Sequence, residues 1–341
     1  MARKIARIEQ IDEVSSIEGA DRIDVARVGG WRVVVRKGEF AVGDSVVFFE
    51  IDTFLPTADP RFAFLATRGE KTMTANGQDV RGHVLKTAKM RGVVSQGLVL
   101  RAADILGPDE IPTRGTEVAE HIGVIQWEPP VEAGSDDLAG PFPTYLAPKS
   151  DAERVQNLTF EYELLRTGAQ WFATEKIDGT SITVARDPDG VLFVCSRNNA
   201  LREGNGVHWQ AVRELGLDAM VQPGQAIQAE VFGPKVQANP LKVAARSIAV
   251  FAFIENRRVV PRSDWPAAVV ALGAPVYEGI ELPASVDAAI AQANGIKSLI
   301  SPNLLAEGIV WHTASGQTFD ELDGRTCFKV ISNAWLIKHE G

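Results

Sequence analysis

A segment rich in proline, glycine and acidic residues divides this chain into two parts. It runs from Gln126 to Lys149, contains five prolines and includes the stretch EAGSDDLAG. Such a composition disfavours regular structure and is typical of linkers. Because 341 residues are about twice a typical domain length, we expect two domains. Their predicted bounds are residues 1–125 and 150–341, with 126–149 as the linker.

The first part has the pattern of a small β-barrel. Five β-branched stretches are spaced about ten residues apart and separated by glycine-containing turns: RKIARIEQI, DRIDVARV, WRVVVRK, DSVVFFEI and SQGLVLRAADI. Five such strands predict a Greek-key barrel, of which the OB-fold is the commonest nucleic-acid-binding example. Residues 57–80, which contain TADP, TRGE and TANGQD, are expected to form a long loop between the fourth and fifth strands.

The second part mixes helical and strand patterns, so the predicted fold class is α+β. Three helix-like stretches alternate with apolar strand-like ones: SDAERVQNLTFEYELLRTG, GVHWQAVRELGLDAM and SVDAAIAQANG. Only two cysteines occur, Cys195 and Cys327, without a metal-binding spacing. No signal-like start and no run of 18 apolar residues is present, so we expect a cytoplasmic protein that does not enter membranes, and a monomer.

The net charge of −9 conceals a difference between the two parts. Residues 1–101 carry 16 basic and 13 acidic side chains, a net charge of +3, whereas the remainder has a net charge of −12. One stretch without acidic residues contains Arg81, Lys86, Lys89, Arg91 and Arg101. Such a stretch fits either a phosphate-contacting face or a solvated charged surface.

The stretch ATEKIDGTSITV, residues 173–184, places Lys176 directly before Ile177-Asp178-Gly179. An isolated KxDG occurs by chance, and by itself Lys176 fits a surface residue. Downstream, Arg197 in CSRNN follows a strand and offers a fork of donors to phosphate, although a structural salt bridge explains it equally well. Glu230 in AEVFGP suits ribose hydroxyls or metal-bound water, or the cap of a turn.

Two further stretches complete the pattern. SIAVFAFIENRR contains Phe251 and Phe253, each able to stack on a base, although aromatic residues of apolar strands are usually core. Glu307 in AEGIVWHT begins an apolar strand, and Lys329 lies within RTCFKVIS. Charged groups in apolar surroundings need a partner or a metal to compensate their burial.

Taken in this order, the stretches resemble the covalent nucleotidyltransferase superfamily of ATP-dependent polynucleotide ligases and messenger-RNA capping enzymes. EKIDG resembles the nucleophile motif, and SRN, AEVFGP, VFAF, EGIVW and FKVIS resemble the motifs that follow it. EKIDGTS, EVFGPKVQANP and EGIVWH are closer to RNA ligases than to DNA ligases. With the barrel first, RGVVSQGL within it and ERVQNL before the lysine, the chain resembles the Deinococcus and Naegleria type of RNA ligase.

This resemblance implies three steps. Lys176 attacks the α-phosphate of ATP and releases pyrophosphate, AMP passes from the lysine to a 5′-phosphate end, and a 3′-hydroxyl then displaces AMP. Deprotonating a lysine of ordinary pKa at pH 7 costs about 4.6 kcal/mol. We therefore expect neighbouring cations and partial burial to lower the pKa of Lys176.

The resemblance also implies roles for further residues. Lys329 acts with Lys176 in catalysis, and Mg²⁺ or Mn²⁺ suits the oxygen ligands Asp178, Glu307 and Glu230, in part through waters. The expected ATP contacts are Lys176, Arg197, Glu230, Phe251, Lys329 and Arg154, the last of which fits a helix surface equally well. In the barrel, Arg81, Lys86, Lys89 and Arg91 are candidate RNA contacts, and Trp31 is either a stacking platform or core.

Two positions depart from the family pattern, and several alternatives stay open. Ile331 occupies the position of a second lysine in the last motif, and Ala229 replaces a glycine in the third. The expected partners are RNA ends or a nicked duplex with a 3′-OH RNA strand. The alternatives are a DNA or mixed RNA/DNA nick ligase, a capping guanylyltransferase, and a non-catalytic RNA-binding protein with a decayed transferase domain.

Overall fold

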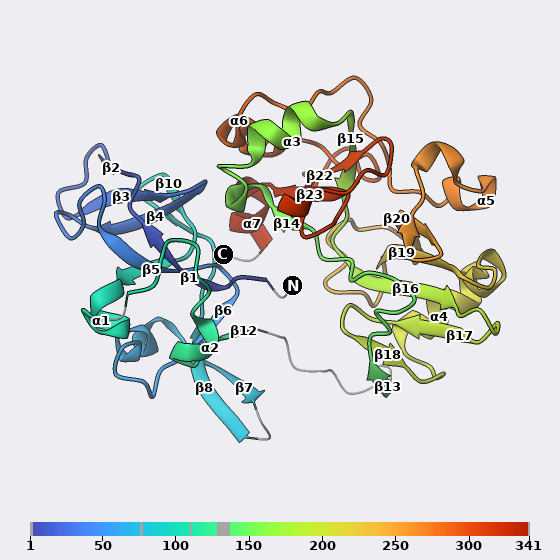
Figure 1. Ribbon diagram of the computed structural model, residues 1–341, viewed down its shortest axis with the longest axis horizontal. Coiled ribbons are helices and arrows are strands. Elements are labelled where there is room, and N and C mark those ends of the chain that lie inside the picture. The colour runs from blue at the N-terminus through green and yellow to red at the C-terminus, as the bar shows by residue number, and fades with distance from the viewer. Residues whose placement is uncertain (1–2, 76–77, 110, 128–136, 340–341) are drawn as a thin grey trace. The chain divides into compact units, whose positions relative to one another are not determined.

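The computed structural model describes residues 3–75, 78–109, 111–127 and 137–339 (Figure 1). The chain forms two compact units. The first comprises Met1–Pro130 with Leu336–Gly341, and the second comprises Val131–Trp335.

The first unit is built from short antiparallel strands. Its elements are β1 (Ala6–Gln10), β2 (Glu13–Ser16), β3 (Ile23–Val28), β4 (Trp31–Arg36), β5 (Ser45–Phe49), β6 (Thr53–Pro56), η1 (Ala63–Arg68), β7 (Lys71–Ala75), β8 (Gln78–Val84), β9 (Ala88–Met90), β10 (Val93–Ser95), β11 (Leu98–Arg101), α1 (Ala102–Leu106), α2 (Ala119–Ile122) and β12 (Ile125–Gln126). The strands pair in the orders β1-β5-β11, β2-β3-β4, β10-β9 and β12-β6-β8-β7. The five predicted strands are confirmed as β1, β3, β4, β5 and β11.

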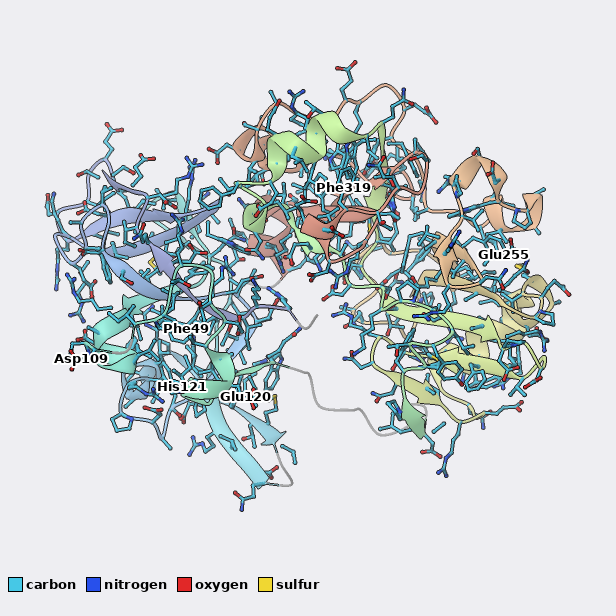
Figure 2. All side chains as sticks on the ribbon, viewed as in Figure 1. Phe49, Asp109, Glu120, His121, Glu255 and Phe319 are labelled. Atoms are coloured by element: carbon cyan, nitrogen blue, oxygen red, sulfur yellow. The ribbon has the colours of Figure 1, made fainter. Side chains whose placement is uncertain are left out.

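Aromatic side chains fill the core of this unit. Phe49, labelled in Figure 2, contacts Phe62 edge to face with ring centroids 5.5 Å apart. Trp31 is fully buried, and its ring lies 5.6 Å from that of Phe48. Of the two alternatives for Trp31, the structure confirms the core position and excludes the stacking platform, because a ring enclosed in the core presents no face to a base.

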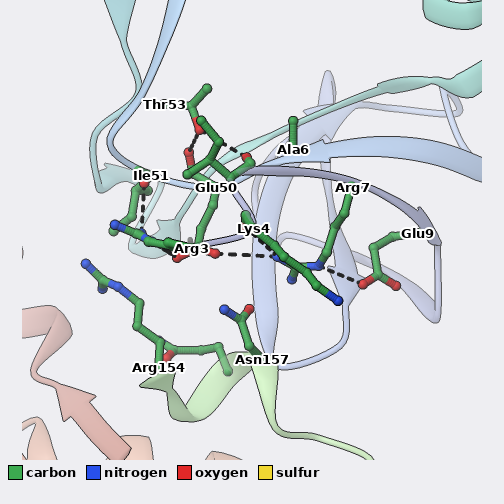
Figure 3. A network of polar contacts seen from close by, with 12 residues as sticks. Arg3, Lys4, Ala6, Arg7, Glu9, Glu50, Ile51, Thr53, Arg154 and Asn157 are labelled. Atoms are coloured by element: carbon green, nitrogen blue, oxygen red, sulfur yellow. Dashed lines mark hydrogen bonds and ion pairs between the residues drawn. The ribbon is translucent and has the colours of Figure 1, made fainter. Parts of the chain in front are cut away.

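A buried charge network joins β1 to the turn after β5 (Figure 3). The carboxylate of Glu50 is fully buried and accepts hydrogen bonds from the guanidinium groups of Arg3 and Arg7. Thr53 Oγ1 donates to the carbonyl oxygens of Glu50 and Ile5 at 2.7 and 3.1 Å. Because a buried carboxylate is costly without such partners, the two arginines are needed for the charged form of Glu50.

The predicted long loop over residues 57–80 is wrong over much of its length. The segment contains η1, and β7 pairs with β8 in antiparallel register, with Thr72 opposite Arg81. Threonine suits a strand, but the polar and glycine-rich composition around it hides the apolar alternation by which strands are predicted.

The second unit contains two larger sheets. Its elements are β13 (Leu138–Pro141), β14 (Glu153–Arg154), η2 (Val155–Asn157), α3 (Tyr162–Gly168), β15 (Trp171–Lys176), β16 (Thr180–Arg186), β17 (Leu192–Cys195), β18 (Asn199–Leu201), α4 (Val207–Leu215), η3 (Leu217–Met220), β19 (Gln225–Phe232), β20 (Ser247–Glu255), β21 (Arg258–Val259), η4 (Arg262–Asp264), α5 (Ala267–Val270), α6 (Val286–Ala293), β22 (Gly308–Thr313), η5 (Asp320–Leu322), β23 (Cys327–Ile331) and α7 (Asn333–His339). The sheet orders are β13-β18-β17-β16-β19-β20-β21 and β14-β23-β22-β15.

Each of these sheets has its own core. Trp209 of α4 and Val269 near the end of α5 pack with side chains of β16, β19 and β20. Leu165 of α3 and Ala289 of α6 pack with Trp311 and other side chains of the four-stranded sheet. The predicted helices are confirmed in α4 and α6, but the first is confirmed only from Tyr162 as α3, because its earlier part forms β14 and η2; the fold class is α+β as expected. Among the described residues, no helix has the length and the apolar composition that are needed to span a membrane.

The described portion of the predicted linker, residues 137–149, belongs structurally to the second unit. Leu138–Pro141 forms β13 at the edge of the seven-stranded sheet, and Phe142, Leu146 and Ala147 are buried against that sheet. These apolar side chains hold the segment in place despite its proline content.

Candidate active site

Lys176 lies where the chain passes from one sheet of the second unit to the other (Figure 1). It is the last residue of β15 in the four-stranded sheet, and Thr180 begins β16 in the seven-stranded sheet. Between them, a Cβ on Gly179 would lie 2.1 Å from the carbonyl oxygen of Val231. Glycine is therefore required there, because a side chain would force β16 and β19 apart.

The amine of Lys176 is paired with Glu307, which immediately precedes β22. Lys176 Nζ lies 2.7 Å from Glu307 Oε2, and the two side chains are 21% and 10% exposed. Burial lowers the pKa of Lys176, but the attraction of the carboxylates of Glu307, Glu230 and Asp178 raises it, and the net pKa lies above its ordinary value. The structure thus holds Lys176 as an ammonium ion, contrary to the expectation of neighbouring cations.

Glu230 of β19 belongs to the same electrostatic cluster. Burial raises the pKa of Glu230 to about 7, with smaller contributions from the attraction of Lys176 and Arg197 and from the repulsion of Glu307 and Asp178. Five predicted site residues therefore act on one another: Lys176, Asp178, Arg197, Glu230 and Glu307. Arg197 itself is exposed, in the turn between β17 and β18.

Lys329 lies on β23, on the same face of the four-stranded sheet as Lys176. Register pairs link Lys176 to Gly308 and Gly308 to Ile331, and residues two apart on a strand share a face. Lys329 Nζ contacts Asp151 Oδ1 at 2.8 Å. Ile331, at the position of the family's second lysine, is only 4% exposed. The residue that lies in line with Lys176 across the sheet, beyond Gly308, is therefore apolar where the family has its second lysine.

Arg154 is placed beside Lys329 and not on a helix surface. It ends the two-residue strand β14, which pairs in parallel with β23 so that Arg154 is in register with Lys329. Its side chain is buried, with 6% exposed. This register brings a second cationic residue next to Lys329.

Phe251 differs from Phe253 in its surroundings. Phe253 is 3% exposed in the core, whereas Phe251 is half-buried. Phe251 falls at an irregularity in the register between β19 and β20, opposite the step from Gln228 to Ala229. Because bulges re-aim side chains, Phe251 is the better candidate for stacking on a base.

Two acidic residues of this region were not predicted from the sequence. One is Asp151, the partner of Lys329. The other is Glu175, which is 2% exposed and whose Oε2 accepts hydrogen bonds from Leu299 N at 2.7 Å and Ile300 N at 3.4 Å. Glu175 thus fastens β15 to the loop that leads to Glu307. The sequence signal for Glu175 was an acidic residue near the end of an apolar strand, directly before the candidate nucleophile.

The donor set of the cluster suits a hydrated divalent cation. Asp178, Glu230 and Glu307 supply only carboxylate oxygens, which Mg²⁺ and Mn²⁺ prefer, and all three act on the same ammonium. Within the described residues, however, no group of three or more acidic, histidine or cysteine side chains is arranged to hold a metal directly. Contacts through water molecules of the ion fit this geometry.

The first unit carries the candidate RNA contacts, and several of them have acidic partners. The ion pairs join Arg81 to Glu70, Lys86 to Asp52 and Arg101 to Asp44. Lys89 and Arg91 are exposed at the β9–β10 turn. Arg91 also lines a groove of about 590 Å³, together with Arg27, Arg32, Glu13 and Glu18. The groove contains three arginines and two glutamates, so it is a concave feature with a small excess of positive charge.

Comparison with known proteins identifies both units. An OB-fold domain model matches residues 5–102, and an RNA ligase model matches residues 169–331. A search among curated proteins found no match.

Among solved structures, the chain is similar to Naegleria gruberi RNA ligase with PPi, with a TM-score of 0.84, 33% identity and 99% of each chain covered. A lysine-to-alanine mutant of that ligase with ATP and Mn gives a TM-score of 0.85, again with 33% identity over 99% of each chain. A lysine-to-methionine mutant with AMP and Mn gives 0.84 at the same identity and coverage.

Proposed function

Because the chain belongs to the RNA ligase family, we propose that it joins the 3′-OH and 5′-phosphate ends of RNA through a lysyl-AMP intermediate on Lys176. Sealing of nicks in RNA repair is the role that we propose in the cell. The observation that carries the proposal is the pairing of Lys176 with Glu307 at 2.7 Å, inside a cluster that also contains Glu230, Asp178 and Arg197.

In this proposal ATP is the nucleotide and Mn²⁺ or Mg²⁺ the metal. The support for ATP and Mn is that structures of the Naegleria ligase contain them, and Mg²⁺ is proposed from the carboxylate donors alone. A divalent cation bound near Asp178, Glu230 and Glu307 would offset the negative charge that raises the pKa of Lys176.

The chain's own residues then have separate tasks. Glu307 holds the amine of Lys176 at the end of β15, and the amine attacks the α-phosphate once its proton has left. Lys329 and Arg154, which are in register on adjacent strands, are proposed to oppose phosphate charge, together with Arg197 of the β17–β18 turn. Phe251 is proposed to stack on adenine.

The first unit is proposed to hold RNA through its basic groove, in a cytoplasmic protein that acts as a monomer. Because its contribution is electrostatic, RNA binding should weaken as salt is raised. The proposed partners are RNA ends or a nicked duplex with a 3′-OH RNA strand.

The test is incubation with ATP labelled at the α-phosphate and Mn²⁺ or Mg²⁺, followed by denaturing electrophoresis. We expect label on the wild type and none on Lys176→Ala or on Lys176→Arg, which keeps the charge but not the nucleophile. Absence of label on the wild type would refute the proposal that the protein is a ligase. Sealing of all-RNA, all-DNA and mixed nicks then distinguishes an RNA ligase from a DNA or mixed-nick ligase.

A further inference from the structure

The segment 142–151, here called the strap, crosses the seven-stranded sheet and ends at the candidate active site. Phe142 N donates to Asn198 O at 2.9 Å, and Lys149 Nζ donates to Asn198 Oδ1 at 3.1 Å. Both ends of the strap are therefore fixed to the turn that carries Arg197. The buried side chains of the strap form one cluster with side chains of β16, β17, β18, β19 and β20.

The last residues of the strap touch the site itself. Pro148 O accepts a hydrogen bond from Gln228 Nε2 at 2.7 Å, and the hydroxyls of Ser150 and Ser181 lie 3.1 Å apart. Ser181 is in register with Glu230. The next residue of the strap, Asp151, pairs with Lys329. The strap thus runs from the arginine turn to the second lysine of the site.

Tyr145 is the exposed aromatic residue of this strap, whereas the strap's other aromatic side chain, Phe142, is buried. Its side chain is 60% exposed, whereas Phe142, Leu146 and Ala147 are buried in the cluster beneath. The ring of Tyr145 contacts Phe193 edge to face, with centroids 6.5 Å apart. An aromatic ring held by a rigid base, with most of its surface in solvent, is suited to stacking on a nucleobase.

The strap and the turn to which it is bonded also carry positive charge that complements a nucleic-acid backbone. Lys149, four residues after Tyr145, is exposed and is hydrogen bonded to Asn198, and the preceding residue Arg197 is exposed as well. The strap's one acidic residue, Asp151, is paired with Lys329. Positive charge with an adjacent aromatic ring is the usual composition of a single-strand binding surface.

We propose that the strap is an RNA-contacting surface for the strand being sealed, with Tyr145 stacking on a base and Lys149 contacting a phosphate. The inference rests on the proposed ligase function. Tyr145 is five residues from Ser150, which limits the distance between their Cα atoms to about 17 Å. At about 3.4 Å per stacked nucleotide, about five nucleotides would span that distance.

The test compares lysyl-AMP formation without RNA with the affinity of the full chain for an RNA strand, measured over a range of salt concentrations. Tyr145→Ala should leave lysyl-AMP formation within about twofold and weaken RNA binding between about fivefold and 150-fold, since stacking on one base contributes about 1–3 kcal/mol. Tyr145→Phe should bind as the wild type does. Lys149→Ala should lower the slope of log affinity against log salt by about 0.7–0.9.

Matched controls lie in the same unit away from the strap. Val270→Ala truncates an exposed apolar side chain at the end of α5, and Arg258→Ala removes an exposed charge on β21 at the opposite edge of the sheet; neither should change binding. Wild-type binding by Tyr145→Ala, or an equal loss of lysyl-AMP formation and RNA binding, would refute the inference. If the wild type itself forms no lysyl-AMP, the proposed function fails first.

Discussion

The amine of Lys176 lies 2.7 Å from the carboxylate of Glu307, so the candidate nucleophile is held as a charged ion pair. Burial alone would lower the pKa of Lys176, but three carboxylates raise it above its ordinary value. Because the amine must lose its proton before it attacks phosphate, these carboxylates oppose the first step in the absence of a compensating cation.

Substitution of Glu307 should separate two effects of this carboxylate on Lys176: it positions the amine, and it raises the pKa of the amine. We expect Glu307→Gln to lower the maximal rate of lysyl-AMP formation at least tenfold, because the amine loses its anchor. The acidic limb of the pH–rate profile should move to lower pH, because a partner that raises the pKa of Lys176 is gone. Label incorporation measured from pH 5 to pH 9 checks both effects. Glu321→Gln, at an exposed acid of η5, should change neither.

The glycine of the KxDG sequence should tolerate no side chain. In Gly179→Ala the new Cβ would lie 2.1 Å from Val231 O, so β16 must move away from β19. A displacement of about 1 Å at a reacting group costs about 100-fold in rate, and we expect a loss of that order in lysyl-AMP formation. Gly204→Ala is the matched control, since its nearest neighbour is 3.8 Å away. Equal rates for the two variants would contradict the argument.

The sequence predicted the site better than its surroundings because the motif residues are polar interruptions of apolar strands. Lys176, Glu230 and Glu307 each stand at or near the end of such a strand, and the structure brings them together with Asp178 and Arg197. Their pairings could not be predicted, because they depend on the register between strands far apart in the chain.

The burial of individual side chains was the property that the sequence predicted least well. Trp31 follows two glycines, which is compatible with a turn, yet its ring is fully enclosed. The sequence showed that Ile331 stands where the family has a lysine. Only the strand register shows that Ile331 lies in line with Lys176 across the sheet, and that Arg154 lies beside Lys329. Such placements depend on the sheet order, which local patterns do not specify.

Glu175 should act through the loop that it anchors. Glu175→Ala leaves Leu299 N without its acceptor, while Ile300 N keeps Ser298 Oγ at 3.1 Å, and we expect a loss of about 1–3 kcal/mol in stability. The rate of lysyl-AMP formation should fall because the same loop leads to Glu307. Glu175→Gln keeps a carbonyl acceptor and should restore most of the rate and most of the melting temperature. If the negative charge of Glu175 acted on Lys176 directly, Glu175→Gln and Glu175→Ala would instead form lysyl-AMP equally slowly.

The carboxyl group of Glu230 should make stability depend on pH. Its pKa is raised to about 7 in the folded chain, so the folded state binds more protons than the unfolded state between about pH 4.5 and 7. Stability from this group is therefore present at low pH and is lost as pH rises through 7. At pH 8 the charged carboxylate costs up to about 3 kcal/mol relative to a neutral group. Glu230→Gln removes that cost, while Lys176 keeps Glu307 as its partner.

The measurement is the melting temperature of variant and wild type from pH 5 to pH 8.5 with a chelator and without ATP. The difference, Glu230→Gln minus wild type, should be small at pH 5 and should grow through pH 7 to several degrees. Glu321→Gln, which removes an exposed carboxylate, should give a difference that does not vary over this range. A constant difference for Glu230→Gln would mean that Glu230 is charged throughout and that Lys176 and Arg197 together compensate its burial.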